Sequence, residues 1–152
     1  MIKEVQITKE KLEFLFENLA KEDYLELKSS IKENLKEIFI KMCLQEKNAI
    51  MLSINNKIIA IGGVSECNYE NKVGRLWLLI TRYAKNHRIE LFKYLNKKID
   101  DFKKEYKVLF NEIYKSNFKI IPFLKKNGFK IKNSKNKNYK IFYFNKGGNF
   151  DI

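Results

Sequence analysis

The sequence is poor in the features that mark several common classes of protein. It has only two cysteines, Cys43 and Cys67, among 152 residues, and their spacing fits neither a zinc site nor a disulfide framework. No apolar run approaches the roughly 18 residues of a membrane span, and the first residues do not resemble a signal peptide. We therefore expect free thiols, no metal site, no membrane partner, and a soluble protein made in a reducing cytoplasm.

Linkers and repeats are also lacking. The chain has one proline and six glycines, and neither an interdomain linker nor an internal repeat is visible. Its length is that of one domain, and the 45% hydrophobic and 14% aromatic residues are enough for a packed core. We expect a single domain over residues 1–146, followed by a flexible tail at 147–152 where apolar periodicity stops.

Arginine is scarce in a strongly basic chain. The formal net charge is +13, yet only three of the 31 basic residues are arginines: Arg75, Arg82 and Arg88. Such a charge favours an anionic partner such as nucleic acid. The lysines also accompany many Asn, Ile, Phe and Tyr residues, which share A/T-rich codons, so a codon bias is an alternative cause. The sequence leaves both explanations open.

Hydrophobic periodicity predicts an alternation of strands and helices. Thr8 is expected to cap the first helix, Ser29 or Ser30 the second, and Asn55-Asn56 to form a hairpin turn. The predicted elements are strands at 2–7, 49–54, 57–62, 74–81, 107–113, 129–132 and 139–144, and helices at 8–19, 27–42, 86–102 and 117–127. The order β-α-α-β-β-β-α-β-α-β-β predicts an α+β fold, in which four helices flank a mixed sheet of about six to seven strands.

The segment from Asn111 to Phe129 is the most informative part of the chain. It predicts a strand, a turn capped by Ser116 or Asn117, a short amphipathic helix, and a Gly128-Phe129 step into another strand. With Ala60-Ile-Gly-Gly63 and Trp77 in a matching order of elements, it resembles the GNAT acetyltransferase superfamily. Within that superfamily the resemblance is closest to the GNAT-like proteins of tailed phages, including the T7-type internal virion or virion assembly protein. It covers about Ala49 to Phe144.

The resemblance implies a site for acetyl-CoA. In the GNAT fold two neighbouring parallel strands splay apart, and here these would be the strands ending at Thr81 and Ile113. The pyrophosphate would lie at the turn that follows the first of them. The implied cofactor-binding residues are Leu79, Ile80, Thr81, Lys85, Asn86, His87, Arg88, Ile89 and Asn117. Asn117 is equally suited to capping a helix.

The sequence departs from the family at two places. Active members hold the pyrophosphate with a glycine-rich turn, but Lys85 to Glu90 contains no glycine, so cationic side chains would have to replace backbone donors. The family often places a tyrosine, which acts as the general acid that reprotonates the departing thiolate, where this chain has Leu124. Glu112 as base and Tyr114 as acid are the remaining catalytic candidates. By alternation Glu112 can equally face solvent, and Tyr114 can be a packed strand residue.

Two functions follow from the resemblance. The first is an acyl-CoA-dependent N-acyltransferase, encoded by a phage or mobile element, that acts on an unidentified amine acceptor. The alternative is a non-catalytic GNAT-fold phage protein that acts in virion assembly or binds a host macromolecule through its basic surface. Either function would be exercised in the host cytoplasm or in the virion.

Overall fold

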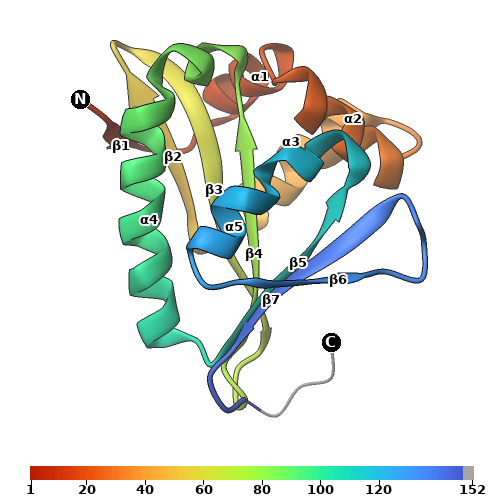
Figure 1. Cartoon of the computed structure of the whole chain (residues 1–152). Helices are drawn as coiled ribbons and strands as arrows, with labels where there is room; N and C mark the ends of the chain where they lie inside the picture. Colours follow the sequence, from red (N-terminus) through yellow and green to blue (C-terminus); the bar gives the residue numbers. More distant parts are fainter. Residues whose placement is uncertain (149–152) are drawn as a thin grey trace. The chain divides into compact units, whose positions relative to one another are not determined.

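The structure is a computed structural model that describes residues 1–148. It divides into two compact units. Unit 1 contains Met1–Gly63 and Leu78–Tyr94, and unit 2 contains Val64–Trp77 and the chain from Leu95 onward. Strands β3 and β4 and helix α4 run from one unit into the other (Figure 1). Most of the predicted tail, from residue 149 onward, lies outside the described residues.

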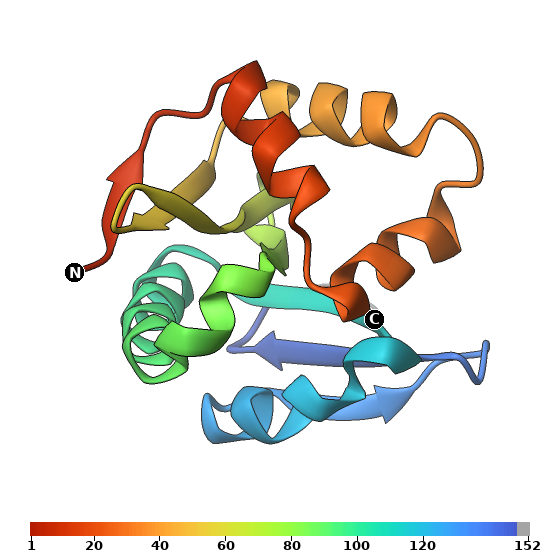
Figure 2. The same ribbon diagram turned by 90° about the horizontal axis from the view of Figure 1, so that it is seen from above.

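Unit 1 holds the amino-terminal helices and half of the sheet. Helices α1 and α3 lie on one side of β2 and β3, and the first turns of α4 lie on the other side (Figure 2). The elements are β1 (Lys3–Val5), α1 (Lys9–Glu17), α2 (Lys21–Ser30), α3 (Leu35–Gln45), β2 (Ala49–Ile54), the first half of β3 (Lys57–Asn68), the end of β4 (Val73–Ile80), the 3₁₀-helix η1 (Arg82–His87) and the start of α4 (Arg88–Glu105).

Two local signals of unit 1 appear as predicted. The hydroxyl of Thr8 accepts a hydrogen bond of 3.2 Å from the backbone N–H of Lys11, so Thr8 caps α1. Asn55 and Asn56 have φ values of 50° and 65°, which a tight hairpin turn between β2 and β3 requires. Both turn and cap depend on one or two residues, and the sequence predicted them directly.

The second predicted helix is wrong as a single element. The structure ends α2 at Ser30 and begins α3 at Leu35, and Asn34 between them has a left-handed φ of 53°. The hydroxyls of Ser29 and Ser30 donate to carbonyls within the last turn of α2, so neither serine caps a helix N-terminus. Residues 1–148 therefore contain five α-helices where four were predicted.

Unit 2 holds the other half of the sheet. Strand β7 is antiparallel to both β5 and β6, and β5 is parallel to β4. The remaining elements are β5 (Val108–Tyr114), the 3₁₀-helix η2 (Lys115–Ile120), α5 (Ile121–Lys126), β6 (Lys130–Asn133) and β7 (Tyr139–Asn145). Ser116 and Asn117 lie inside η2 rather than at a helix cap. Gly128, with a φ of 86°, ends the turn after α5 and leads into β6.

The buried core of unit 2 lies on one face of its strands. Leu109 and Ile113 of β5 and Phe142 of β7 join Leu124 of α5 and Ile99 of α4 in one cluster. The two helices therefore cover the same face of the β5–β7–β6 strands.

The seven strands form one mixed sheet in the order β1-β2-β3-β4-β5-β7-β6. The predicted fold class is confirmed. Among residues 1–148 no helix is long and apolar enough to cross a membrane. Over the same range no three His, Cys, Asp or Glu side chains come together in a way that could hold a metal ion.

Candidate functional site

Strands β4 and β5 stop pairing well before either strand ends. Their parallel ladder joins Val73–Arg75 to Val108–Phe110. Asn111 lies immediately beyond it. Its side-chain Nδ2 donates to the carbonyl oxygen of Leu76 at 3.0 Å, and its Oδ1 accepts from the backbone N–H of Glu112 at 2.7 Å. One side-chain amide thus satisfies a backbone group of each strand where the ladder ends.

The end of β4 in unit 1 has one edge on β3. The backbone N–H of Thr81 donates to Ile59 of β3 at 2.9 Å, and the Thr81 hydroxyl donates to the carbonyl oxygen of Ile58 at 2.8 Å. Successive N–H groups of a strand point to opposite edges. The N–H groups of Ile80 and Arg82 therefore point to the edge away from β3.

Residues of the chain itself occupy that other edge. The Ile80 N–H donates to Oδ2 of Asp23 at 2.7 Å, and the Ile80 carbonyl accepts from the N–H of Ala20 at 2.9 Å. The Arg82 N–H donates to the carbonyl oxygen of Asn18 at 2.8 Å. Residues 18–23, which we call the α1–α2 connection, thus form a short antiparallel bridge with the end of β4.

Asp23 makes this bridge more than a backbone contact. Asp23 is only 6% exposed, and its carboxylate accepts a hydrogen bond directly from the backbone N–H of Ile80. Hydrogen bonds to an ionised acceptor are roughly twice as strong as those between neutral groups. Any ligand that pairs with Ile80 must first displace this carboxylate.

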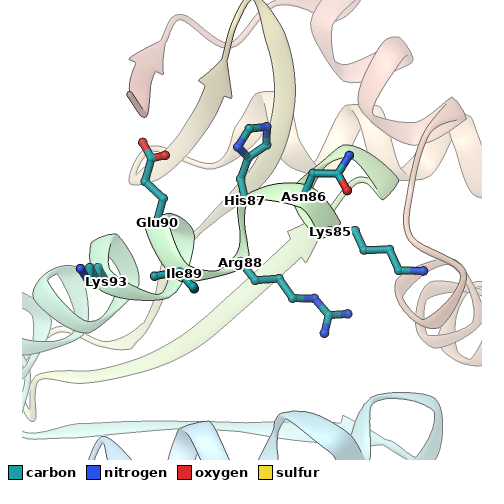
Figure 3. Close-up of a pocket in the computed structure, with 7 residues that line it drawn as sticks. All are labelled: Lys85, Asn86, His87, Arg88, Ile89, Glu90 and Lys93. Carbon is teal, nitrogen blue, oxygen red and sulfur yellow. The ribbon is translucent and has the colours of Figure 1, made fainter.

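A hollow of about 470 Å³ lies at the turn after β4. It is lined by Lys85, Asn86, His87, Arg88, Ile89, Glu90 and Lys93. The side chains of Lys85 and Arg88 point to one side of the ribbon, and those of His87 and Glu90 point to the other (Figure 3). The Glu90 carboxylate lies 3.3 Å from the amino group of Met1. The two cations are therefore directed away from the one acidic group of the hollow.

The backbone of this turn is suited to side-chain binding rather than to a backbone cradle. Residues 82–87 form a 3₁₀-helix that leads directly into α4. In such a helix each N–H donates to a carbonyl three residues earlier. The turn also lacks glycine, so Cβ atoms keep a ligand away from its backbone. A diphosphate would have to be held by Lys85 and Arg88.

No protein-family model matches the chain, and no curated protein sequence matches it. Solved structures do. The GNAT domain of a Streptomyces lividans PAT protein matches with a TM-score of 0.68 at 12% identity, over 94% of this chain and 88% of that one. The Campylobacter jejuni N-acetyltransferase PseH, in complex with acetyl coenzyme A, matches with a TM-score of 0.58 at 16% identity, over 97% and 100% of the two chains. The PaiA N-acetyltransferase of Thermoplasma acidophilum, in complex with coenzyme A, matches with a TM-score of 0.60 at 17% identity, over 95% and 99%.

This chain has the GNAT fold. With this fold, five of the residues predicted to bind the cofactor come together in unit 1, because Lys85, Asn86, His87, Arg88 and Ile89 all line the hollow after β4. Leu79 and Thr81 are 8% and 1% exposed, so their side chains face the protein. The side chain of Ile80, the third candidate of this segment, is half-buried.

The other candidates lie in unit 2. Glu112 of β5 is exposed. The ring of Tyr114 lies 5.2 Å from that of Tyr139, which is the packing of a strand residue on its cross-strand partner. Leu124, which stands where the family often has a tyrosine, is 5% exposed within the core cluster. Asn117 is half-buried in η2.

A second hollow of about 240 Å³ also borders η1, and the sequence did not indicate it. Ile54, Asn55, Lys57, Ile59, Tyr83, Asn86 and His87 line it. The ring of Tyr83 stacks on that of Phe14 with centroids 5.9 Å apart, and Nζ of Lys57 lies 4.5 Å from the Tyr83 centroid. These internal contacts fix Tyr83 beside the turn.

The sequence pattern did not indicate the α1–α2 connection either. Asp23 lies in the first turn of α2, where an acidic residue ordinarily complements the helix dipole. Its bond to Ile80 joins residues 57 positions apart. Hydrophobic periodicity indicates only which nearby residues share a face of one element, so it cannot predict a contact between residues that far apart in the sequence.

Proposed function

We propose that this protein is an acyl-CoA-dependent N-acyltransferase. In this structure the α1–α2 connection occupies the edge of β4 at which the cofactor would bind. The observation that carries the proposal is the paired direction of Lys85 and Arg88 at the hollow after β4. Two cations on one side of a turn suit a diphosphate. Two solved proteins with this fold, PseH and PaiA, are in complex with acetyl coenzyme A or coenzyme A.

The residues of unit 1 fit the diphosphate of the cofactor but leave no open place for its thioester arm. Lys85 and Arg88 fit the diphosphate. The thioester arm would pair with the edge of β4, where both backbone groups of Ile80 are already bonded to Ala20 and Asp23. Binding of that arm thus requires the α1–α2 connection to withdraw. Giving up two hydrogen bonds, one of them to a carboxylate, costs about 2–4 kcal/mol.

The chemistry that acyl-CoA supplies when bound is an activated thioester for transfer to a neutral amine. The chain's own contribution at the described site is to hold the diphosphate and to position the arm. Glu112 and Tyr114 as proton-transfer groups, and Asn117 as a contact for the pantetheine arm, stay predictions. The acceptor amine is not identified by any group in unit 1.

A second candidate is favoured by the same closed edge. A non-catalytic GNAT-fold protein of a phage or mobile element, acting in virion assembly or binding a host macromolecule, would not need an open β4 edge, a glycine turn or a tyrosine acid. Ile80 is occupied, residues 85–90 contain no glycine, and Leu124 is buried in the core. In this candidate the α1–α2 connection is a permanent part of the fold.

Titration with acetyl-CoA, followed by calorimetry and by thermal shift, separates the two candidates. The acyltransferase proposal predicts binding at up to millimolar cofactor, and predicts that the double variant Lys85→Ala/Arg88→Ala weakens it at least tenfold. The matched control Lys41→Ala/Lys47→Ala removes two lysines of unit 1 outside the hollow and should bind like the unchanged protein. Absence of heat and of thermal shift at millimolar acetyl-CoA would contradict the first candidate and leave the second.

A further inference from the structure

The positive charge of the chain is concentrated in its last third. Residues 103–152 contain 13 basic and 3 acidic residues, a net charge of +10, whereas residues 1–102 contain 18 basic and 15 acidic residues, a net charge of +3. A codon bias acts on the whole chain, so it does not explain why acidic residues nearly disappear from one part of it. The charge of unit 2 needs a structural explanation.

The strand register shows which side chains share the face opposite the core. Paired residues of neighbouring strands have their side chains on the same face. Phe110 of β5 pairs with Arg75 of β4 on one side and with Tyr143 of β7 on the other, and Tyr143 pairs with Lys130 of β6. The neighbouring residue Leu109 belongs to the core cluster. Phe110 and its partners therefore lie on the face away from α5 and the end of α4.

The result is a row that crosses four adjacent strands in the order cation, ring, ring, cation. We call Arg75, Phe110, Tyr143 and Lys130, with Lys132 in the next row, the aromatic–basic face. At a strand spacing of about 4.8 Å the row spans about 14 Å. Arg75 and Lys130 are exposed, and the two rings are half-buried.

The cations of this face lie close to its rings. The guanidinium carbon of Arg75 lies 5.6 Å from the centroid of Phe110, and Nζ of Lys132 lies 5.9 Å from the centroid of Tyr143. Each ring thus has a cation beside it that can bind a phosphate while the ring stacks on a base. The only acidic residue of β5, β6 and β7 is Glu112. By strand alternation it lies on this same face, in the row that Ile141 and Lys132 share, and not in the row of Arg75, Phe110, Tyr143 and Lys130.

We propose that the aromatic–basic face of unit 2 binds single-stranded nucleic acid. Planar bases stack on the two rings, and the backbone phosphates pair with Arg75, Lys130 and Lys132. An acidic peptide would satisfy the cations but has no planar group for each ring. A duplex hides its bases from a sheet surface. The proposal does not depend on the acyltransferase proposal, because it uses no residue of the β4 edge at Ile80 or of the hollow after it.

The test is fluorescence anisotropy of the full chain with a labelled 12-nucleotide single strand, as oligo(dT) and as oligo(U), over a range of salt concentrations. The variant Phe110→Leu/Tyr143→Leu keeps apolar bulk and removes the flat rings. It should weaken binding by about tenfold or more, the effect of losing stacked bases. The variant Arg75→Gln/Lys130→Gln should lower the salt slope by about 1.4, at about 0.7 per phosphate.

The matched control is Lys28→Gln/Lys41→Gln, which removes two exposed lysines of unit 1 and should leave affinity and salt slope nearly unchanged. Circular dichroism checks that each variant is folded. The proposal is overturned if no binding occurs at about 50 mM salt, or if the control loses as much as the face variants. It is also overturned if the ring variant binds as tightly as the unchanged protein, or if an acidic polypeptide such as poly-glutamate binds in preference to the single strands.

Discussion

The side-chain nitrogen of Asn111 lies 3.0 Å from the carbonyl oxygen of Leu76. This bond stands immediately beyond the last paired residues of β4 and β5, Arg75 and Phe110. The same side chain accepts from the Glu112 N–H. A single asparagine therefore ends the parallel ladder of unit 2 without leaving its backbone groups unsatisfied.

We predict that Asn111→Leu destabilises the protein by about 1–3 kcal/mol, because the Leu76 carbonyl and the Glu112 N–H each lose a partner. Urea denaturation measures the loss. The control is Asn133→Leu at the exposed end of β6, where the change should be within about 0.5 kcal/mol. Equal losses in the two variants would contradict this, because they would show that the two hydrogen bonds of Asn111 add nothing to the free energy of unfolding.

A second prediction concerns Gly128. Its φ of 86° is unfavourable for residues with a side chain, and an added Cβ would lie 2.8 Å from Nζ of Lys103. The lysine end can move, so backbone strain dominates, and Gly128→Ala should cost about 1 kcal/mol in the free energy of unfolding. Gly128→Asn should cost less, since asparagine tolerates this conformation. Thermal unfolding that ranks alanine equal to or above asparagine would contradict this.

The two cysteines should differ in reactivity. Cys67 is exposed, whereas burial raises the pKa of the Cys43 thiol to about 12. A thiol reagent at pH 8 should modify one cysteine per chain quickly, and Cys67→Ser should remove that fast phase. Two fast-reacting thiols in the folded protein would show that Cys43 is not protected.

The same shift gives a pH dependence of stability. The pKa of Cys43 is raised in the folded protein from an ordinary value of 9.0 to about 12. Below pH 9 the thiol is neutral in both states and contributes no pH dependence. Above pH 9 only the unfolded chain ionises, so this contribution to stability falls towards pH 12. Cys43→Ala should flatten the decline in urea midpoint between pH 8 and pH 10.5, after allowance for its lower overall stability. An unchanged slope would contradict the assignment.

Features set by one or two residues were predictable from the sequence. The Thr8 cap, the Asn55-Asn56 turn and the Gly128 step each follow from the chemistry of the residue at that position. The break between α2 and α3 was not predictable by periodicity. Leu27, Ile31 and Leu35 keep a helical spacing across it, so the apolar pattern continues where the helix stops.

The position of the candidate site in the chain was predictable in part. The order of elements located the turn after β4, and the residues expected there do line one hollow. The closure of Ile80 depends on Ala20 and Asp23, which lie about 60 residues away along the chain. Only the folded arrangement shows that the α1–α2 connection occupies the edge of β4.

We propose that acetyl-CoA binds at the edge of β4 at Ile80 and that Asp23 holds this edge closed. The acetyl-CoA affinity of Asp23→Ala, measured by calorimetry, tests this proposal. Removing the carboxylate releases the Ile80 N–H, so the variant should bind acetyl-CoA at least tenfold more tightly than the unchanged protein. The exposed acidic residue of α1 replaced in Glu10→Gln serves as the charge control and should bind unchanged. A folded Asp23→Ala protein that binds acetyl-CoA no more tightly than the unchanged chain would show that Asp23 does not hold a cofactor-binding edge closed.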